Sequence, residues 1–264
     1  FILSNIDSEY SWKFFNRYPI FYSKDFYDST RLTLETPDEI KILLYQKENR
    51  EYYVQDKKRA DIVLDDSGMD LKLKSNETAT DIAKDALVFF VNPDNPVDNL
   101  TAEQIRKIYQ GEIKNWKELS GDDCKIAVYN RGEYTYNRNY FDHKVMNGEK
   151  ARVGKMVRTE REYIFEDGQL NKYAAEYENT AGAIGYGYRS LVQKYYGDMV
   201  KILKVNGIEA KKETLQNDSY PYTIPVTATV RNDDSGALGR RVLKWFFSKE
   251  GQAAIKRCGL EQVG

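Results

Sequence analysis

The stretch Asp81–Leu119, DIAKDALVFFVNPDNPVDNLTAEQIRKIYQGEIKNWKEL, decides the fold of this chain. Its continuous apolar run, Ala86–Val91, is rich in residues that favour strands, which predicts a strand covered on both faces. The segment 92–96, Asn-Pro-Asp-Asn-Pro, predicts a turn, because proline interrupts both strand pairing and helix formation. The chain is therefore expected to leave a buried strand through a short turn.

A capped helix is expected directly after this turn, over residues 102–110. Thr101 and Gln104 have the spacing of a capping box, in which each side chain accepts a hydrogen bond from the other residue's backbone N–H. Gly111 can end the helix because glycine readily adopts the left-handed conformation of a C-cap. Strand, turn and helix in direct succession indicate α/β architecture.

The composition is that of an ordinary globular protein. The chain has 264 residues, 41% of them hydrophobic and 31% charged, with 40 Lys and Arg against 41 Asp and Glu. A net charge of −1 gives no global field toward nucleic acid or an anionic membrane, so any anion recognition must be local. No apolar stretch approaches the length of about 18 residues that a membrane span needs. The chain begins with Phe1, which is compatible with a removed export leader.

Further strand-like and helix-like segments alternate along the chain. This alternation predicts largely parallel sheets. Strands are expected at 60–64, 86–91, 125–129, 183–188, 200–205 and 226–230, and further helices at 137–147, 170–178, 189–196, 237–247 and 250–258. Another helix is expected to begin at Pro37, with Ile40, Leu43 and Leu44 on its apolar face.

The segment 81–119 strongly resembles the phosphate-binding proteins of bacterial ABC transporters. In that family an IAKD strand, here residues 82–85, crosses from the first lobe to the second, and a helix with an NWKE hook follows. The resemblance covers residues 60–264 well and residues 1–59 poorly. It continues through 125–131, 179–186, 200–208, 245–255 and Gly259.

The resemblance implies an α/β, two-lobed periplasmic-binding-protein-like fold with two hinge crossings. Carried onto this chain, lobe one would be residues 1–84 plus 222–264, and lobe two residues 85–221. Such lobes close on a ligand by a hinge motion. The Pro-bracketed segment 220–225 would be the returning strand.

The family's main anion contact in lobe two has a match at Arg131. There the family has an arginine, three residues, and then Ser-Gly-Thr at the start of a helix, which together bind phosphate. In register this chain has Thr135, Tyr136 and Asn137, so a tyrosine replaces the glycine. Either the backbone path changes, or aromatic rings fill the site. Arg138 is a candidate for a second positive charge, and the alternative role for Arg131 is an interlobe salt bridge.

Lobe one offers weaker matches. Asp66 matches a family aspartate that accepts a hydrogen bond from protonated phosphate, but Asp65 replaces the family's serine. The pair could instead form a solvated acidic turn, or Asp66 could cap a helix. Ser29 and Thr30 weakly match the family's first donor loop, and could equally be part of an ordinary helix cap.

Catalysis has little support in the sequence. His143 is the single histidine, and metal, flavin and nicotinamide motifs are absent, so no enzymatic activity and no cofactor are expected. The resemblance implies an extracytoplasmic solute-binding protein that delivers phosphate or a related oxyanion to an ABC permease. It would be a monomer, without nucleic-acid partners, and secreted, periplasmic or anchored at the cell surface as a lipoprotein. The alternative is a degenerate module of the same fold (a sensor, adhesion or scaffold protein) that binds a different ligand or none.

Overall fold

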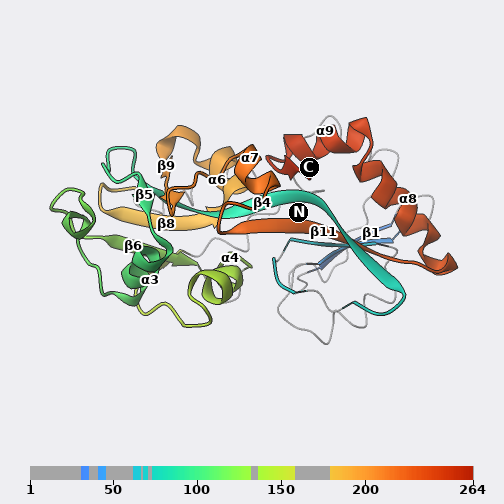
Figure 1. Ribbon diagram of the computed structural model, residues 1–264, viewed down its shortest axis with the longest axis horizontal. Helices are drawn as coiled ribbons and strands as arrows, with labels where there is room; N and C mark the ends of the chain where they lie inside the picture. The colour runs from blue at the N-terminus through green and yellow to red at the C-terminus, as the bar shows by residue number, and fades with distance from the viewer. Residues whose placement is uncertain are drawn as a thin grey trace. The chain divides into compact units, whose positions relative to one another are not determined.

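The chain forms two compact units. The computed structural model describes residues 62–66, 68–70, 73–131, 136–157 and 179–263, and the backbone of strands 31–35 and 41–45. The first unit comprises residues 1–84 and 224–264, and the second comprises 85–223. The chain therefore passes between the units twice, within the long strand β4 (Glu77–Val91) and at the start of β11 (Thr223–Arg231) (Figure 1).

The described sheet of the first unit mixes parallel and antiparallel pairs. β1 (Arg31–Glu35) pairs antiparallel with β2 (Lys41–Tyr45), and β2 pairs parallel with β3 (Ile62–Asp65). β11 lies antiparallel to β3 and next to the first part of β4. The short strand β12 (Glu261–Gln262) closes against β4.

Two helices cover one face of this sheet. The 3-10 turn η5 (Asp234–Gly236) leads into α8 (Ala237–Phe246), and α9 (Lys249–Arg257) follows after Ser248, which caps it by accepting a hydrogen bond from the Gly251 N–H. Alternate strand residues face these helices, as period-two side-chain alternation requires. The resulting core includes Ile62, Leu64, Ile82, Val226, Ala228, Phe246 and Ile255.

The second unit has its own sheet around the second part of β4. β8 (Ala183–Tyr188) pairs antiparallel with β4 and parallel with β6 (Ala127–Arg131). β7 (Lys155–Val157) extends β6 in parallel, and β9 (Lys201–Ile202) adds to β4. β5 (Asn99–Leu100) and β10 (Lys204–Val205) form a separate parallel pair.

Short helices connect the strands of the second unit. They are α3 (Ala102–Gln110), η2 (Trp116–Leu119), α4 (Tyr136–Tyr140) continuing as the π-helical η3 (Phe141–Val145), α6 (Arg189–Tyr195), η4 (Gly197–Met199) and α7 (Lys212–Gln216). The predicted helix α3 is confirmed in full. Thr101 and Gln104 form the reciprocal capping box, and Gly111 has the left-handed φ of 75°.

The hook after α3 fastens the turn that leads into β8. Trp116 is buried, and its Nε1 donates to the Gly182 carbonyl at 3.0 Å. A Cβ on Gly182 would lie 2.3 Å from the Lys125 carbonyl oxygen, so only glycine fits here. Asn92 adds a hydrogen bond from its Nδ2 to the Asn179 carbonyl, at 2.6 Å.

Two expectations from the sequence are wrong. The helix predicted from Pro37 is instead strand β2, because its apolar run finds a hydrogen-bonded neighbour on each side. The sheets are mixed rather than largely parallel, since β4 and β11 run antiparallel to β8 and β3. The helix predicted at 170–178 lies outside the described residues.

Candidate functional site

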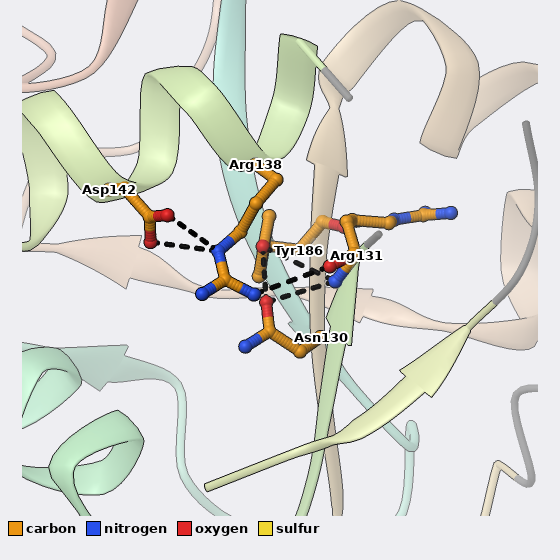
Figure 2. Close-up of polar contacts among 5 residues, drawn as sticks. All are labelled: Asn130, Arg131, Arg138, Asp142 and Tyr186. Carbon is orange, nitrogen blue, oxygen red and sulfur yellow. Dashed lines mark hydrogen bonds and ion pairs between the residues drawn. The ribbon is translucent and has the colours of Figure 1, made fainter. Parts of the chain in front are cut away.

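The candidate site lies at the carboxyl end of β6, where Asn130 and Arg131 end the strand. Ladder pairing between β6 and β8 is present at Ala127–Ala183 and Val128–Ile184. At Arg131 the backbone N–H donates to the Tyr186 hydroxyl and the carbonyl accepts from Arg138, so side chains continue the hydrogen bonding of the strand (Figure 2). In open α/β sheets, ligands bind at the carboxyl ends of strands.

Arg131 is fixed both through its backbone and through its side chain. Its residue exposure is only 6%. The backbone N–H donates to Asn130 Oδ1 at 2.9 Å and to the Tyr186 hydroxyl oxygen at 3.4 Å. Its Nε donates to the Tyr186 carbonyl at 3.2 Å. A guanidinium with a hydrogen-bonded Nε is pre-organised, because fewer of its rotamers remain available.

Tyr186 is the centre of this arrangement. Its hydroxyl donates to Asn130 Oδ1 at 2.6 Å, and its ring stacks on Phe141 with centroids 4.3 Å apart. Burial raises the pKa of Tyr186 above the ordinary value of 10.0, and the charges of Arg138 and Arg131 oppose this only partly. The phenol is therefore neutral at physiological pH and can act as a donor.

A second arginine closes the network from the helical side. Arg138 Nε lies 2.8 Å from both carboxylate oxygens of Asp142, and Nη1 donates to the Arg131 carbonyl at 3.3 Å. The two side chains are 7% and 25% exposed, so the ion pair is largely buried. Figure 2 shows the Arg131 side chain leading away from the Arg138 guanidinium. Asp142 therefore balances the charge of Arg138.

A small pocket adjoins Arg131 within the second unit. It is shallow and partly open to solvent, and Phe90, Tyr129, Gly185 and Tyr196 are among its lining residues. Arg131 is the charged residue of this lining, and the rings of Phe90, Tyr129 and Tyr196 lie around it.

The predicted site residues fall into three groups. Arg131 and Asn137 lie in the described part of the second unit, and Asn137 Oδ1 is buried without a hydrogen-bond partner. The backbone of Tyr136 begins α4. Asp66 follows β3 in the first unit and is half-buried, whereas its neighbour Asp65 is buried at 7% exposure and so belongs to no solvated turn. Ser29, Thr30 and Thr135 lie outside the described residues.

Sequence reasoning named Arg138 as a second positive charge, but it missed the Arg138–Asp142 ion pair and the role of Tyr186. Arg138 and Asp142 are four residues apart on one helical face, a spacing that could have indicated their ion pair. Tyr186 is 56 residues from Asn130 and had no local signal for its role. Its position became predictable only once β6 and β8 were known to pair.

The described residues offer few other chemical groups. Across the described ranges, no three His, Cys, Asp or Glu side chains gather as metal ligands would. His143 is exposed within η3. None of the described helices is long and apolar enough to cross a membrane.

Comparison with known proteins defines the class. Residues 50–250 match the family model described as a PBP superfamily domain. The phosphate-binding protein PstS of Borreliella burgdorferi is 25% identical over 193 residues, covering 71% of this chain and 67% of that protein. PstS of Bacillus subtilis is 29% identical, covering 62% of this chain and 50% of that protein. The chain thus spans between half and two thirds of the length of these relatives.

Solved structures agree with this class. A putative phosphate ABC transporter substrate-binding protein from Clostridium perfringens, solved with bound phosphate, is 27% identical with a TM-score of 0.58, covering 79% of this chain and 81% of that one. An ABC-type phosphate transport receptor from Vibrio cholerae has a TM-score of 0.62 at 23% identity, over 78% and 82% of the two chains, and supports the fold alone.

The chain belongs to the PBP superfamily. The resemblance to phosphate-binding proteins and the two-lobed α/β fold class that were expected from the sequence are both confirmed.

Proposed function

We propose that this chain is an extracytoplasmic solute-binding protein that captures phosphate or a related oxyanion for an ABC importer. The observation that carries the proposal is the buried Arg131 at the end of β6, its Nε held by the Tyr186 carbonyl. The relatives named as phosphate-binding proteins, and the Clostridium structure with bound phosphate, support the choice of ligand. Transport receptors of this class bind and release their ligand, so no catalytic turnover is proposed.

Charge and space favour a small anion at this position. A guanidinium can donate two parallel hydrogen bonds to an oxyanion, and charge-assisted bonds of this kind are short and strong. The pocket beside it is small and aromatic, which disfavours an extended organic ligand. The predicted lobe boundaries, and the contacts of Ser29, Thr30, Asp66, Thr135, Tyr136 and Asn137, are part of the same proposal.

Isothermal titration calorimetry with phosphate tests it. Arg131→Ala should weaken binding roughly 10- to 150-fold, since a lost charge-assisted hydrogen bond costs about 1.5–3 kcal/mol. Arg152→Ala removes the same charge from an exposed position of the second unit and should leave binding unchanged. Arg131→Lys, which keeps the charge but loses the planar fork, should bind between the two. Equal affinity of wild type and Arg131→Ala would remove Arg131 from the site.

A second candidate function is a degenerate module that binds a different ligand or none. It is favoured by the tyrosine at position 136, where the family has glycine, and by the buried Asp65, where the family has serine. The Arg138 charge is also balanced by Asp142 and is not available to a ligand. A folded wild-type protein that produces no heat with phosphate would support this candidate.

A further inference from the structure

The strand β8 contacts Arg131 through two successive residues, and only one of them does so by its side chain. Tyr186 accepts from the Arg131 Nε with its carbonyl and from the backbone N–H with its hydroxyl. Gly187 contributes by having no side chain. A Cβ placed on it would lie 3.3 Å from Arg131 Nη2 and 3.1 Å from Val192 Cγ2. Both separations are tight, so a side chain at 187 would require Val192 and the guanidinium to shift by a few tenths of an ångström.

Period-two alternation explains why these roles fall on neighbouring residues. In the Gly-Tyr-Gly segment 185–187, the two glycines face one side of the sheet and Tyr186 faces the other. Gly185, Tyr186 and Arg131 all line the pocket, and the Tyr186 ring also stacks on Phe141. β8 thus leaves room for the guanidinium at Gly187 and holds Arg131 by hydrogen bonds to Tyr186.

Glycine inside a strand lowers stability and contributes no packing. It is often found where another group approaches the strand closely. At position 187 the approaching groups are Val192 from α6 and the guanidinium of Arg131. The first contact is ordinary packing, and the second is a contact with the proposed anion-binding group.

We propose that Gly187, together with Tyr186, is a positioning residue for anion binding: the missing side chain at 187 gives the Arg131 guanidinium its place over β8, and the Tyr186 carbonyl fixes its direction. This proposal rests on the proposed function, because it takes the Arg131 fork as the anion contact. It makes the identity of residue 187 a determinant of affinity, although Gly187 donates no hydrogen bond from a side chain.

The first test is independent of any ligand. The Arg131 Nε–H resonance can be observed by heteronuclear NMR and assigned by its loss in Arg131→Lys. In Gly187→Ala this resonance should shift. It should also shift in the double variant Gly187→Ala/Val192→Ala, where the valine contact has been relieved and only the Arg131 contact remains. An unchanged resonance in Gly187→Ala overturns the proposal, and so does recovery of the wild-type resonance in the double variant.

The second test measures phosphate affinity by calorimetry. Gly187→Ala should weaken binding about tenfold and Gly187→Val further, with folding checked by the thermal midpoint. In an Arg131→Ala background the same substitutions should have no further effect, because residues acting through one group are not additive. Equal losses in both backgrounds overturn the proposal. If the resonance shifts in Gly187→Ala but the wild-type protein binds no phosphate, the proposed function is contradicted and the positioning of Arg131 by β8 is supported.

Discussion

The start of α3 and the end of β6 differ in where the hydrogen-bond partners of their backbone groups lie in the sequence. Each must satisfy backbone groups that secondary structure leaves unpaired. At α3 the answer is local, since Thr101 and Gln104 exchange hydrogen bonds three residues apart. At the end of β6 the Arg131 N–H is bonded locally by Asn130 Oδ1 and also from far along the chain, by the hydroxyl of Tyr186, 55 residues away. The scaffold is therefore specified locally, and the candidate site depends on the assembled fold.

The two ion pairs at helical i, i+4 spacing make this contrast measurable. Lys107 and Glu103 on α3 lie 2.7 Å apart with side chains 45% and 67% exposed. Arg138 and Asp142 lie 2.8 Å apart with side chains 7% and 25% exposed. The spacing is the same, but only the second pair is shielded from water, so the energetic consequences of breaking each pair should differ widely.

The largest effect is expected from Asp142→Ala. It removes the Asp142 carboxylate from the buried Arg138 and should lower the free energy of unfolding by about 3 kcal/mol, the lower end of the range for breaking a buried pair. Urea denaturation measures this change. Glu103→Ala is the matched control, and should produce no measurable change because its pair is exposed. Similar losses in the two variants would contradict the contrast.

A smaller effect is expected from Thr101→Ala. It removes the hydroxyl that accepts from the Gln104 N–H at 3.1 Å, and should cost about 1 kcal/mol of unfolding free energy. Thr101→Ser keeps the hydroxyl and should remain close to wild type. Phosphate affinity should be unchanged in both variants, because this cap serves the scaffold. If serine and alanine destabilise equally, the hydroxyl is not the stabilising group.

The same contrast explains which parts of the fold and of the candidate site could be predicted from the sequence. The helix α3, its cap and Gly111 were predicted to the residue, because each depends on neighbours a few positions away. The apolar run in β2 was read as a helix, since a short apolar run does not reveal whether strands will lie on both its sides. Arg131 was found by its resemblance to a family motif. Tyr186 and Gly187 were not, because their roles exist only once β8 lies next to β6.

The smallest expected effect concerns Asp85, whose carboxylate also accepts hydrogen bonds from a residue far along the chain, Ser190. It is buried where the chain enters the second unit, and its carboxylate accepts from the Ala86 N–H at 2.8 Å, the Ser190 N–H at 3.1 Å and the Ser190 hydroxyl at 2.5 Å. Burial raises the pKa of Asp85 above its ordinary value of 3.8, although these hydrogen bonds and the charge of Arg189 oppose the shift. Desolvation of the charge therefore exceeds the stabilisation that its partners supply.

The sign of the pH dependence follows from this raised pKa. The folded protein holds the Asp85 proton to higher pH than the unfolded chain does. The contribution of Asp85 to stability is therefore complete below the unfolded pKa, and it is lost as pH rises through the folded pKa. Asp85→Asn cannot titrate, so its unfolding free energy, measured by urea denaturation from about pH 4 upward, should decline less steeply than that of wild type. At neutral pH the two proteins should differ little, since the amide relieves a buried charge but gives up one acceptor for Ser190. Parallel curves for the two proteins would show that Asp85 has the same affinity for its proton in the folded and unfolded chain.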